Sequence, residues 1–391
     1  VGQEAVDQAA RNPENTIHAA KRFLGRPYAQ VANDAARVGY AVVADEEGDV
    51  LFECPHLSDP VAPEEVSALV IDSMLESLRA ANLPPVEAAV ITVPAYFRET
   101  QREATMAAAA LAGLDEITLL AEPVAACLAY GLDGATGKVL VFDLGAGTFD
   151  VSVLSLGARG EVEVIATGGD PRLGGSDFDA LLVDHVCALA VKAGIDPRAD
   201  PRHMRQLRDA VEAAKIKLSV VKSVDVEVSG SSAASGGVSF VTLTLTRREL
   251  ERVCEPLLQR LRAPLYEVAL SARIAMPGEA AAPPPQKRAK KKVRDARRDA
   301  LPDGPLKYLP QGDPLTEIVM VGGAGRMVSV RSLVGNLFGV TPRRTVDPME
   351  AVALGAAVYA GILQGRVEGR VLQKWQADLG RMLDSGSFSG V

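Results

Sequence analysis

The sequence predicts an α/β fold, because segments with the pattern of buried strands alternate along the chain with segments that have the pattern of helices. The clearest strand pair lies at residues 138–142 and 151–154, which are β-branched and aromatic runs. The eight residues between them include Gly145 and Gly147, which allow a tight turn and the close approach of a ligand. We therefore take this strand–turn–strand unit as the centre of the predicted fold.

Composition sets the class of protein. The 391 residues suffice for one large domain or two to three ordinary ones, and 48% hydrophobic with 24% charged residues is typical of a soluble globular protein. A net charge of −8 argues against nucleic acid as a partner, and no apolar stretch is long enough to predict a membrane span. The four cysteines lie far apart without a C-x-x-C motif, which favours a reducing compartment over zinc binding or a disulfide framework.

The first third of the chain shows both kinds of segment. Strands are predicted at residues 38–43, 50–54, 88–93 and 117–120. Helices are predicted from caps, apolar faces and terminating glycines or prolines. A short helix precedes Asn12-Pro13, and a second runs from Asn15 to Gly25. Three more are predicted from Pro63, from a Thr100–Glu103 capping box to Gly113, and at 124–130.

The pattern continues after the central hairpin. Strands are predicted at residues 161–167, 224–228, 240–245 and 317–321. Helices are predicted at 178–192, at 202–219, from a capping box at Thr246 to about 275, after the glycine turn at 322–326, and from a cap at Asp347 to Gly365.

Residues 277–313 interrupt this alternation. Prolines bound the segment, and within it lies a basic run at 287–292. One interpretation of 283–298 is a nuclear-localisation or nucleic-acid patch. The other, which the flanking prolines and alanines favour, is a solvated loop between a helix and a strand. We expect a mobile excursion here, because the like charges repel one another.

The turn at 143–150 carries groups that suit phosphate and a metal ion. Backbone N–H groups in such a turn can form a concave anion site, and Thr148 adds a hydroxyl donor. Asp143 and Asp150 supply carboxylates, which suit hydrated Mg²⁺. The turn is not a P-loop, whose glycines open a helix and end in Lys-Ser/Thr. The alternative is a plain β-hairpin with glycines in its turn.

This octet, DLGAGTFD, resembles the second phosphate loop of the actin-like ATPases, and its wording is similar to that of the seventy-kilodalton heat-shock chaperone (DnaK-like) family. Further stretches resemble the same family: VGQEAVDQAARNPENTIHAAKRFLGR, PEEVSALVIDSML, ITVPAYFRETQREAT, LLAEPVAACLAYGL, ATGGDPRLGGSDFD, EAAKIKLS, EIVMVGGAGR and DPMEAVALGAAV. The resemblance covers nearly everything except 28–60, 277–313 and the tail. Actin-like sugar kinases and filament proteins share the two glycine turns but would not be expected to show VPAYFRETQREA.

The resemblance implies roles for particular residues. The catalytic set is Lys21, Glu122, Asp143, Thr148 and Asp150. Lys21 would offer its charge to the γ-phosphate and the attacking water, while Glu122 and Asp143 would hold waters of a Mg²⁺ ion. The alternatives are an ordinary helix-surface lysine for Lys21 and a carboxylate ahead of a Pro-opened helix for Glu122.

The resemblance also implies a nucleotide-binding set: Gly145, Ala146, Gly147, Thr148, Gly175, Glu212, Lys215, Ile216, Ser219, Gly322, Gly323, Ala324, Gly325 and Arg326. The alternative for Glu212, Lys215 and Ser219 is a solvated helix face with one ion pair, worth only ~0.3–0.5 kcal/mol. The sequence departs from the family pattern at several of these positions. Ala146 replaces a third glycine, Ile216 occupies the adenine-stacking position, Ala324-Gly325 replaces Ser-Thr, and Met349 replaces an acid.

The resemblance implies an actin-like ATPase fold of two lobes around a nucleotide cleft, on which Lys21, Glu122, Asp143 and Thr148 would converge. Lobe I would comprise about 1–136 and 345–366, and lobe II about 138–344 with the insert 277–313, leaving the tail 367–391 unassigned. The family's first phosphate loop would lie upstream of Val1, with the N-terminal strands of lobe I, and its peptide-binding domain has no counterpart downstream.

The function implied is the ATP-binding and hydrolysis module of a heat-shock chaperone, with ATP or ADP and Mg²⁺ as cofactors. A J-domain co-chaperone and a nucleotide exchange factor would be partners, and unfolded polypeptide would bind only through a domain absent here. The compartment would be the cytoplasm or an organelle such as a plastid or mitochondrion. The alternative is a non-hydrolysing regulatory or exchange-factor-type binding protein.

We expect residues 1–391 to hydrolyse ATP slowly or not at all, because phosphoryl transfer depends on charge stabilisation and only one of two phosphate loops is present. Loss of one well-placed donor costs ~3–4 kcal/mol in other enzymes, or roughly 100- to 1,000-fold in rate. A single-turnover assay with Mg-ATP, on this chain and on one extended upstream by the first loop, measures the difference. Equal rates would contradict the expectation.

Overall fold

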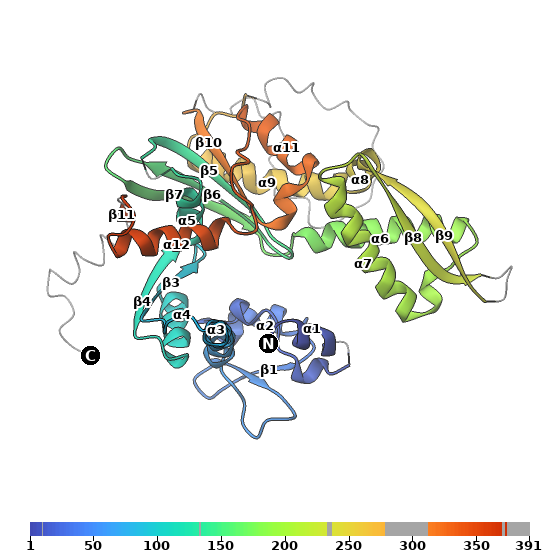
Figure 1. Ribbon diagram of the computed structural model, residues 1–391, viewed down its shortest axis with the longest axis horizontal. Helices are drawn as coiled ribbons and strands as arrows, with labels where there is room; N and C mark the ends of the chain where they lie inside the picture. Colours follow the sequence, from blue (N-terminus) through green and yellow to red (C-terminus); the bar gives the residue numbers. More distant parts are fainter. Residues whose placement is uncertain (10, 133, 233–236, 278–311, 370–371, 374–391) are drawn as a thin grey trace. The chain divides into compact units, whose positions relative to one another are not determined.

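The computed structural model describes residues 1–9, 11–132, 134–232, 237–277, 312–369 and 372–373 (Figure 1). The basic segment 283–298 and most of the tail 367–391 therefore lie outside the described residues. The chain forms two compact units. The first comprises Val1–Ala125 and Ala356–Arg366, and the second Ala126–Gly355 and Val367–Val391. Each predicted lobe overlaps one unit, and the lobes themselves stay a prediction.

The first unit combines short strand pairs with helices. Its elements are α1 (Gln3–Gln8), η1 (Pro13–Asn15), η2 (Ala20–Arg22), α2 (Tyr28–Ala35), β1 (Ala41–Ala44), β2 (Val50–Glu53), α3 (Pro63–Ala80), β3 (Ala88–Val93), α4 (Glu99–Leu111) and β4 (Glu116–Ala121). Strands β1 and β2 pair antiparallel, and β3 and β4 pair parallel. A small core of Phe23, Val31, Tyr40, Val50 and Phe52 holds the N-terminal segment against β1 and β2.

The helix predicted from Asn15 to Gly25 is wrong. The structure has only two 3₁₀ turns there, η1 and η2, separated by extended backbone at Thr16. Ala19 has a φ of 58°, in the left-handed region, and a right-handed helix cannot continue through such a residue. This backbone conformation is stabilised by the burial of the Phe23 side chain, which packs edge-on against Phe52.

The capping box predicted at Thr100–Glu103 is displaced. Helix α4 begins at Glu99, and the side chain of Gln101 accepts the backbone N–H of Arg98 at 3.3 Å. The hydroxyl of Thr100 instead donates to the carbonyl of Gly25 at 3.0 Å, a contact between distant segments that local sequence rules do not include. Helix α2 lies in a region where no helix is predicted.

The second unit is built on a five-stranded mixed sheet. Its strands are β5 (Gly137–Leu144), β6 (Phe149–Leu156), β7 (Glu161–Asp170), β10 (Leu315–Val321) and β11 (Leu372–Gln373), in the order β10-β5-β6-β7-β11. Strands β5, β6 and β7 form an antiparallel meander, and β10 adds parallel to β5. The other elements are α6 (Gly175–Lys192), η3 (Pro197–Ala199), α7 (Pro201–Leu218), β8 (Ser223–Ser232), β9 (Gly237–Thr246), α8 (Arg247–Val253), α9 (Glu255–Ser271), η4 (Gly323–Arg326) and α11 (Val328–Phe338). Two helices, α5 (Glu122–Ala129) and α12 (Ala351–Leu363), span the boundaries between the units.

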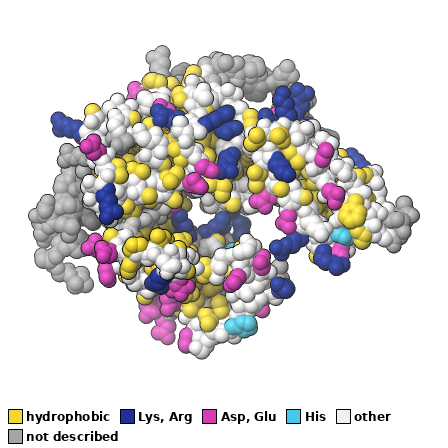
Figure 2. Space-filling view, viewed as in Figure 1, with side chains coloured by type: hydrophobic (Ala, Val, Ile, Leu, Met, Phe, Trp, Pro, Cys, Tyr) yellow, Lys and Arg dark blue, Asp and Glu magenta, His cyan; other side chains and the backbone are white. Residues whose placement is uncertain are grey.

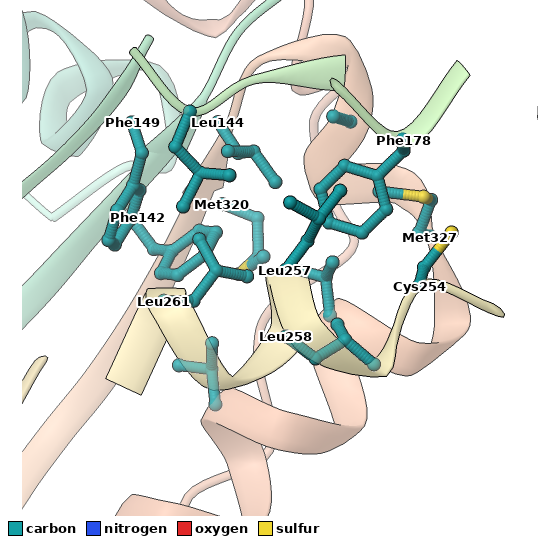
Figure 3. Close-up of a cluster of buried hydrophobic side chains, with 14 of the residues drawn as sticks. Phe142, Leu144, Phe149, Phe178, Cys254, Leu257, Leu258, Leu261, Met320 and Met327 are labelled. Atoms are coloured by element: carbon teal, nitrogen blue, oxygen red, sulfur yellow. The ribbon is translucent and has the colours of Figure 1, made fainter. Parts of the chain in front are cut away.

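The central hairpin is fixed by its apolar face. Phe142, Leu144 and Phe149 are fully buried and point to the same side of the sheet. Figure 3 shows them in one cluster with Leu257 and Leu261 of α9. A slip of one residue in the β5–β6 register would move this set to the opposite face, so burial holds the turn at 145–148 in place.

The long helix predicted from Thr246 is interrupted. Thr246 caps it as predicted, with its hydroxyl accepting the N–H of Glu249 at 3.2 Å. The chain then breaks at Cys254 into α8 and α9, and Pro256 stands in the first turn of α9, where its missing N–H costs no helical hydrogen bond. After α9, Ile274 bridges Asp313, which joins the chain on either side of residues 278–311.

Charged side chains of both signs are interspersed on the face shown in Figure 2. Within the described part of the chain, no helix is both long enough and apolar enough to cross a membrane.

The four cysteines, Cys54, Cys127, Cys187 and Cys254, are all free and buried, and burial raises the pKa of Cys127 and Cys254 to about 12. Because the thiolate is the reacting species, we expect iodoacetamide at pH 8 to label these two at least about a hundredfold more slowly than free cysteine. Mass spectrometry of the native protein measures this. The urea-unfolded chain is the control and should label at all four positions. Rapid labelling of native Cys127 or Cys254 would contradict the burial.

Candidate functional site

The turn between β5 and β6 is held by the start of α6. Its carbonyl groups at Gly145 and Ala146 accept hydrogen bonds from the N–H groups of Gly175 and Ser176, at 2.9 and 2.8 Å. The turn is closed by a further bond from the N–H of Gly145 to the carbonyl of Thr148 at 3.0 Å. The turn and the helix start, which lie far apart in the sequence, therefore act as one rigid piece.

These bonds orient the donors of the turn. In a trans peptide the C=O and the N–H point in opposite directions. Because the carbonyls of Gly145 and Ala146 face α6, the N–H groups of Ala146 and Gly147 face away from it. Within the described residues these two N–H groups have no hydrogen-bond partner, and both residues are exposed. Successive unpaired N–H groups of this kind form an anion-binding concavity.

Two glycines let neighbouring segments approach the turn closely. A methyl group at Gly174 would overlap the peptide between Ala146 and Gly147. A methyl group at Gly322, which has a φ of 80°, would overlap the carbonyl of Leu144 and lie 2.8 Å from Oδ1 of Asp143. Only glycine tolerates both the approach and, at Gly322, the backbone conformation.

Asp143 and Asp150 stand directly opposite each other in the β5–β6 ladder. Directly paired residues point to the same face of a sheet, so both carboxylates flank the turn on the side opposite the buried Leu144 and Phe149. No group of three or more His, Cys, Asp or Glu side chains that could hold a metal ion occurs among the described residues. The two carboxylates of Asp143 and Asp150 do fit Mg²⁺, because this ion keeps several waters and binds through one or two carboxylates and phosphate oxygens.

Lys215 is a buried residue of the same site. Its side chain is 9% exposed, and Nζ donates to Oδ2 of Asp179 at 2.6 Å and to the carbonyl of Gly175 at 3.2 Å. Burial raises the pKa of Asp179, and the hydrogen bond from Lys215 opposes that rise. A Cβ at Gly175 would lie 3.3 Å from Nζ of Lys215 and 3.4 Å from Cβ of Ala324, so α6, α7 and η4 meet here. The alternative of a solvated helix face is therefore wrong for Lys215.

Arg326 forms an ion pair with Asp347, in which the single nitrogen Nη2 contacts both carboxylate oxygens. This pair lowers the pKa of Asp347, whose Oδ1 also accepts the N–H of Met349 at 3.0 Å. The helix predicted from a cap at Asp347 begins later, at Ala351, after a turn over residues 348–350. Asp347 thus holds one end of the Arg326 guanidinium beside the glycine turn 322–325. A further bond, from the N–H of Gly322 to the carbonyl of Pro348 at 2.9 Å, joins the same two segments.

The first unit brings Lys21 and Glu122 together. Lys21 lies on η2, and Glu122 begins α5 directly after β4. Their side chains form an ion pair, with Nζ of Lys21 2.7 Å from Oε1 of Glu122. Lys21 is 56% exposed and Glu122 20% exposed in their side chains. The catalytic roles that the resemblance implies for these two residues stay a prediction.

The structure groups most of the predicted nucleotide residues of the second unit. Contacts join the turn 145–148, Gly175, Lys215 and the glycine turn 322–325, whereas Glu212 and Ile216 are exposed on α7. Three residues that sequence reasoning did not assign to the site are Gly174, Asp179 and Asp347. The motif GGSDFD contains the first two, and its paired glycines ahead of a helix are the signal that could have found them.

A model of the family described as "Hsp70 protein" matches residues 1–277 and 289–381. The chain belongs to the Hsp70 family. The resemblance drawn from the sequence is thereby confirmed, as is the actin-like fold that it implied.

Several curated relatives align with nearly all of the chain. It is 41% identical over 370 residues to the "Chaperone protein dnaK3" of Thermosynechococcus vestitus, covering 94% of this chain and 49% of that protein. It is 38% identical to the "Chaperone protein dnaK" of Cyanidioschyzon merolae, covering 95% and 56%. It is 39% identical to the "Heat shock 70 kDa protein 7, chloroplastic" of Arabidopsis thaliana, covering 95% and 47%. The chain thus spans about half the length of these relatives.

Removing Asp179 tests the buried pair. We expect Asp179→Ala to lower the free energy of unfolding by about 3 kcal/mol, because the Lys215 ammonium would stay buried with one carbonyl as its partner. Urea unfolding followed by circular dichroism measures the change. The matched control is Asp184→Ala on the same helix. Its pair with Arg198 is 3.8 Å long and mostly exposed, so a change below about 1 kcal/mol is expected. Equal effects of the two substitutions would contradict the assignment.

Proposed function

We propose that this chain is the ATP-binding and ATP-hydrolysing part of an Hsp70 chaperone. The observation that carries the proposal is the pair of exposed, unpartnered N–H groups at Ala146 and Gly147 in the described part of the chain, turned away from α6 by the bonds that their neighbouring carbonyls make. They would bind the β- and γ-phosphates, with the Thr148 hydroxyl as a third donor. Rigid donors placed before the ligand arrives need no reorganisation when it binds.

The nucleoside would lie next to the phosphate-binding turn, along α7 and the glycine turn 322–325. Lys215 supports this because it joins α7 to Gly175, whose N–H in turn binds Gly145. The Arg326 guanidinium is planar and is paired with Asp347 through Nη2, and such a group suits stacking on a base. Ile216 is exposed on α7 and would offer an apolar surface to the same base.

Mg²⁺ would neutralise the phosphate charge when bound. Asp143 and Asp150 would hold its waters on the phosphate side, and Glu122 would hold another. Lys21 would place its positive charge near the γ-phosphate and orient the attacking water, which stabilises the charge that develops during transfer. The contact between Lys21 and Glu122 supports a shared role, since each side chain limits where the other can lie.

In the whole protein, the nucleotide state would control the binding of unfolded polypeptide, and a J-domain co-chaperone and a nucleotide exchange factor would set the rates of hydrolysis and release. These partners come from family resemblance. The printed name of the Arabidopsis thaliana relative includes "chloroplastic", and we propose a location in the cytoplasm or in an organelle such as a plastid or mitochondrion. The second candidate, a non-hydrolysing regulatory relative, is favoured only by the departures Ala324, Gly325 and Met349 from the family pattern.

Isothermal titration with Mg-ATP tests the proposal. We expect binding by the unmodified chain and about ten- to a hundredfold weaker binding by Gly174→Ala. The added methyl would displace the Ala146–Gly147 peptide, and each hydrogen bond to a charged group is worth about 1.5–3 kcal/mol. Gly134→Ala is the matched control, because a Cβ there meets nothing within 4 Å, and it should bind as the unmodified chain does.

The outcomes separate the two candidates. Absence of Mg-ATP binding by the folded, unmodified chain would contradict the proposal. Binding without any hydrolysis in a single-turnover assay, by this chain and also by one extended upstream by the first phosphate loop, would support the regulatory candidate. Binding with hydrolysis that Lys21→Ala slows, at nearly unchanged affinity, would support the ATPase, because Lys21 would then act on the transition state rather than on the bound nucleotide.

A further inference from the structure

The position of Lys21 raises the question of what orients its side chain. Lys21 lies on η2, a turn of three residues, and 56% of its side chain is exposed. A lysine ammonium sits on a flexible stem of four carbons, and fixing that stem costs conformational entropy. The backbone at η2 therefore does not fix Nζ, and the groups that contact Nζ must do so.

Two groups among the described residues contact this ammonium. One is the carboxylate of Glu122, at 2.7 Å. The other is the aromatic ring of Phe97, whose centroid lies 5.8 Å from Nζ, with the ammonium over the ring face. That distance is within the range of a cation–π interaction, in which the negative face of the ring attracts the cation.

Phe97 is a rigid partner. The residue is 5% exposed, and the N–H of Phe97 closes a turn by donating to the carbonyl of Pro94 at 3.1 Å. This turn connects β3 to α4. Burial and the turn fix the ring, so the ring face offers Lys21 a fixed point that the exposed stem lacks.

We propose that Phe97 is a positioning residue for catalysis, whose ring face holds the Lys21 ammonium in its working place. The inference rests on the proposed function of Lys21 and assigns a role to a residue that the catalytic set does not include. Phe97 does not itself meet the phosphates or the reacting water.

The ring supplies something that the carboxylate cannot. The carboxylate of Glu122 neutralises the charge of Lys21, and it is also the group that would hold a Mg²⁺-bound water. The ring attracts the ammonium without cancelling its charge, and neither water nor Mg²⁺ displaces it from its buried position. Phe97 would restrain Lys21 whether or not Glu122 also holds a Mg²⁺-bound water.

Stepwise fluorination of the ring at position 97 tests the proposal. Each fluorine weakens the negative face of the ring while changing its volume little. With mono-, di- and trifluorophenylalanine at position 97, we expect the single-turnover rate constant to fall stepwise, by about two- to fivefold in total. The affinity for Mg-ATP should stay unchanged. In the Lys21→Ala background the same series should leave the residual rate flat, because the cation is gone.

A second measurement does not depend on ATP hydrolysis. In the unmodified protein, the ε-methylene protons of Lys21 should show an upfield ring-current shift by NMR. Phe97→Leu should abolish the shift, and the conservative Phe97→Tyr should retain both the shift and the rate. A rate that does not change along the fluorine series, or that falls equally without Lys21, would overturn the proposal and leave the proposed function intact.

The two failures are distinguishable. If the chain neither binds nor hydrolyses Mg-ATP, the proposed function fails, and the catalytic role of Phe97 fails with it. If hydrolysis occurs and Lys21 shows no ring-current shift, only the role of Phe97 is overturned. A stepwise fall that requires Lys21, together with the shift, supports it.

Discussion

The hydrogen bonds from Gly175 and Ser176 to the carbonyls of Gly145 and Ala146 are the interaction on which the site in the second unit depends. They fix the glycine loop at 145–148 to the first residues of α6. They also decide the direction of the opposite N–H groups, since the two ends of a planar peptide point in opposite directions. The glycines at 174 and 322 are needed because the neighbouring segments must come within backbone contact of the loop.

The core beneath the loop holds this arrangement in register. Phe142, Leu144 and Phe149 pack into the cluster with α9 (Figure 3), while Asp143 and Asp150 lie on the other face of the same two strands. Strand alternation thus places the buried apolar side chains on one face of the hairpin and the two carboxylates on the other. A substitution that removes the core packing of Phe142, Leu144 or Phe149 would therefore also allow Asp143 and Asp150 to change position.

The two lysine–carboxylate pairs, Lys215–Asp179 and Lys21–Glu122, differ in burial and therefore in how rigidly they are held. The Lys215–Asp179 pair is buried and ties α7 to α6, so its contribution is chiefly to fix geometry, because the cost of desolvating two charges offsets most of their attraction. The Lys21–Glu122 pair is more exposed and can exchange partners more readily.

The sequence by itself determined the α/β class, the glycine hairpin, the Thr246 cap and the family, because these depend on neighbouring residues and on motif wording. It did not determine that Lys215 pairs with Asp179, that Thr100 bonds to Gly25, or that the segment 15–25 is not a helix. Each of these depends on segments far apart in the chain. Ala19 adopts its left-handed backbone because Phe23 reaches a core formed with Val31 and Phe52, and only the folded chain places that core beside it. Local sequence patterns predict the helices and strands, whereas packing between distant segments determines which of the predicted elements form.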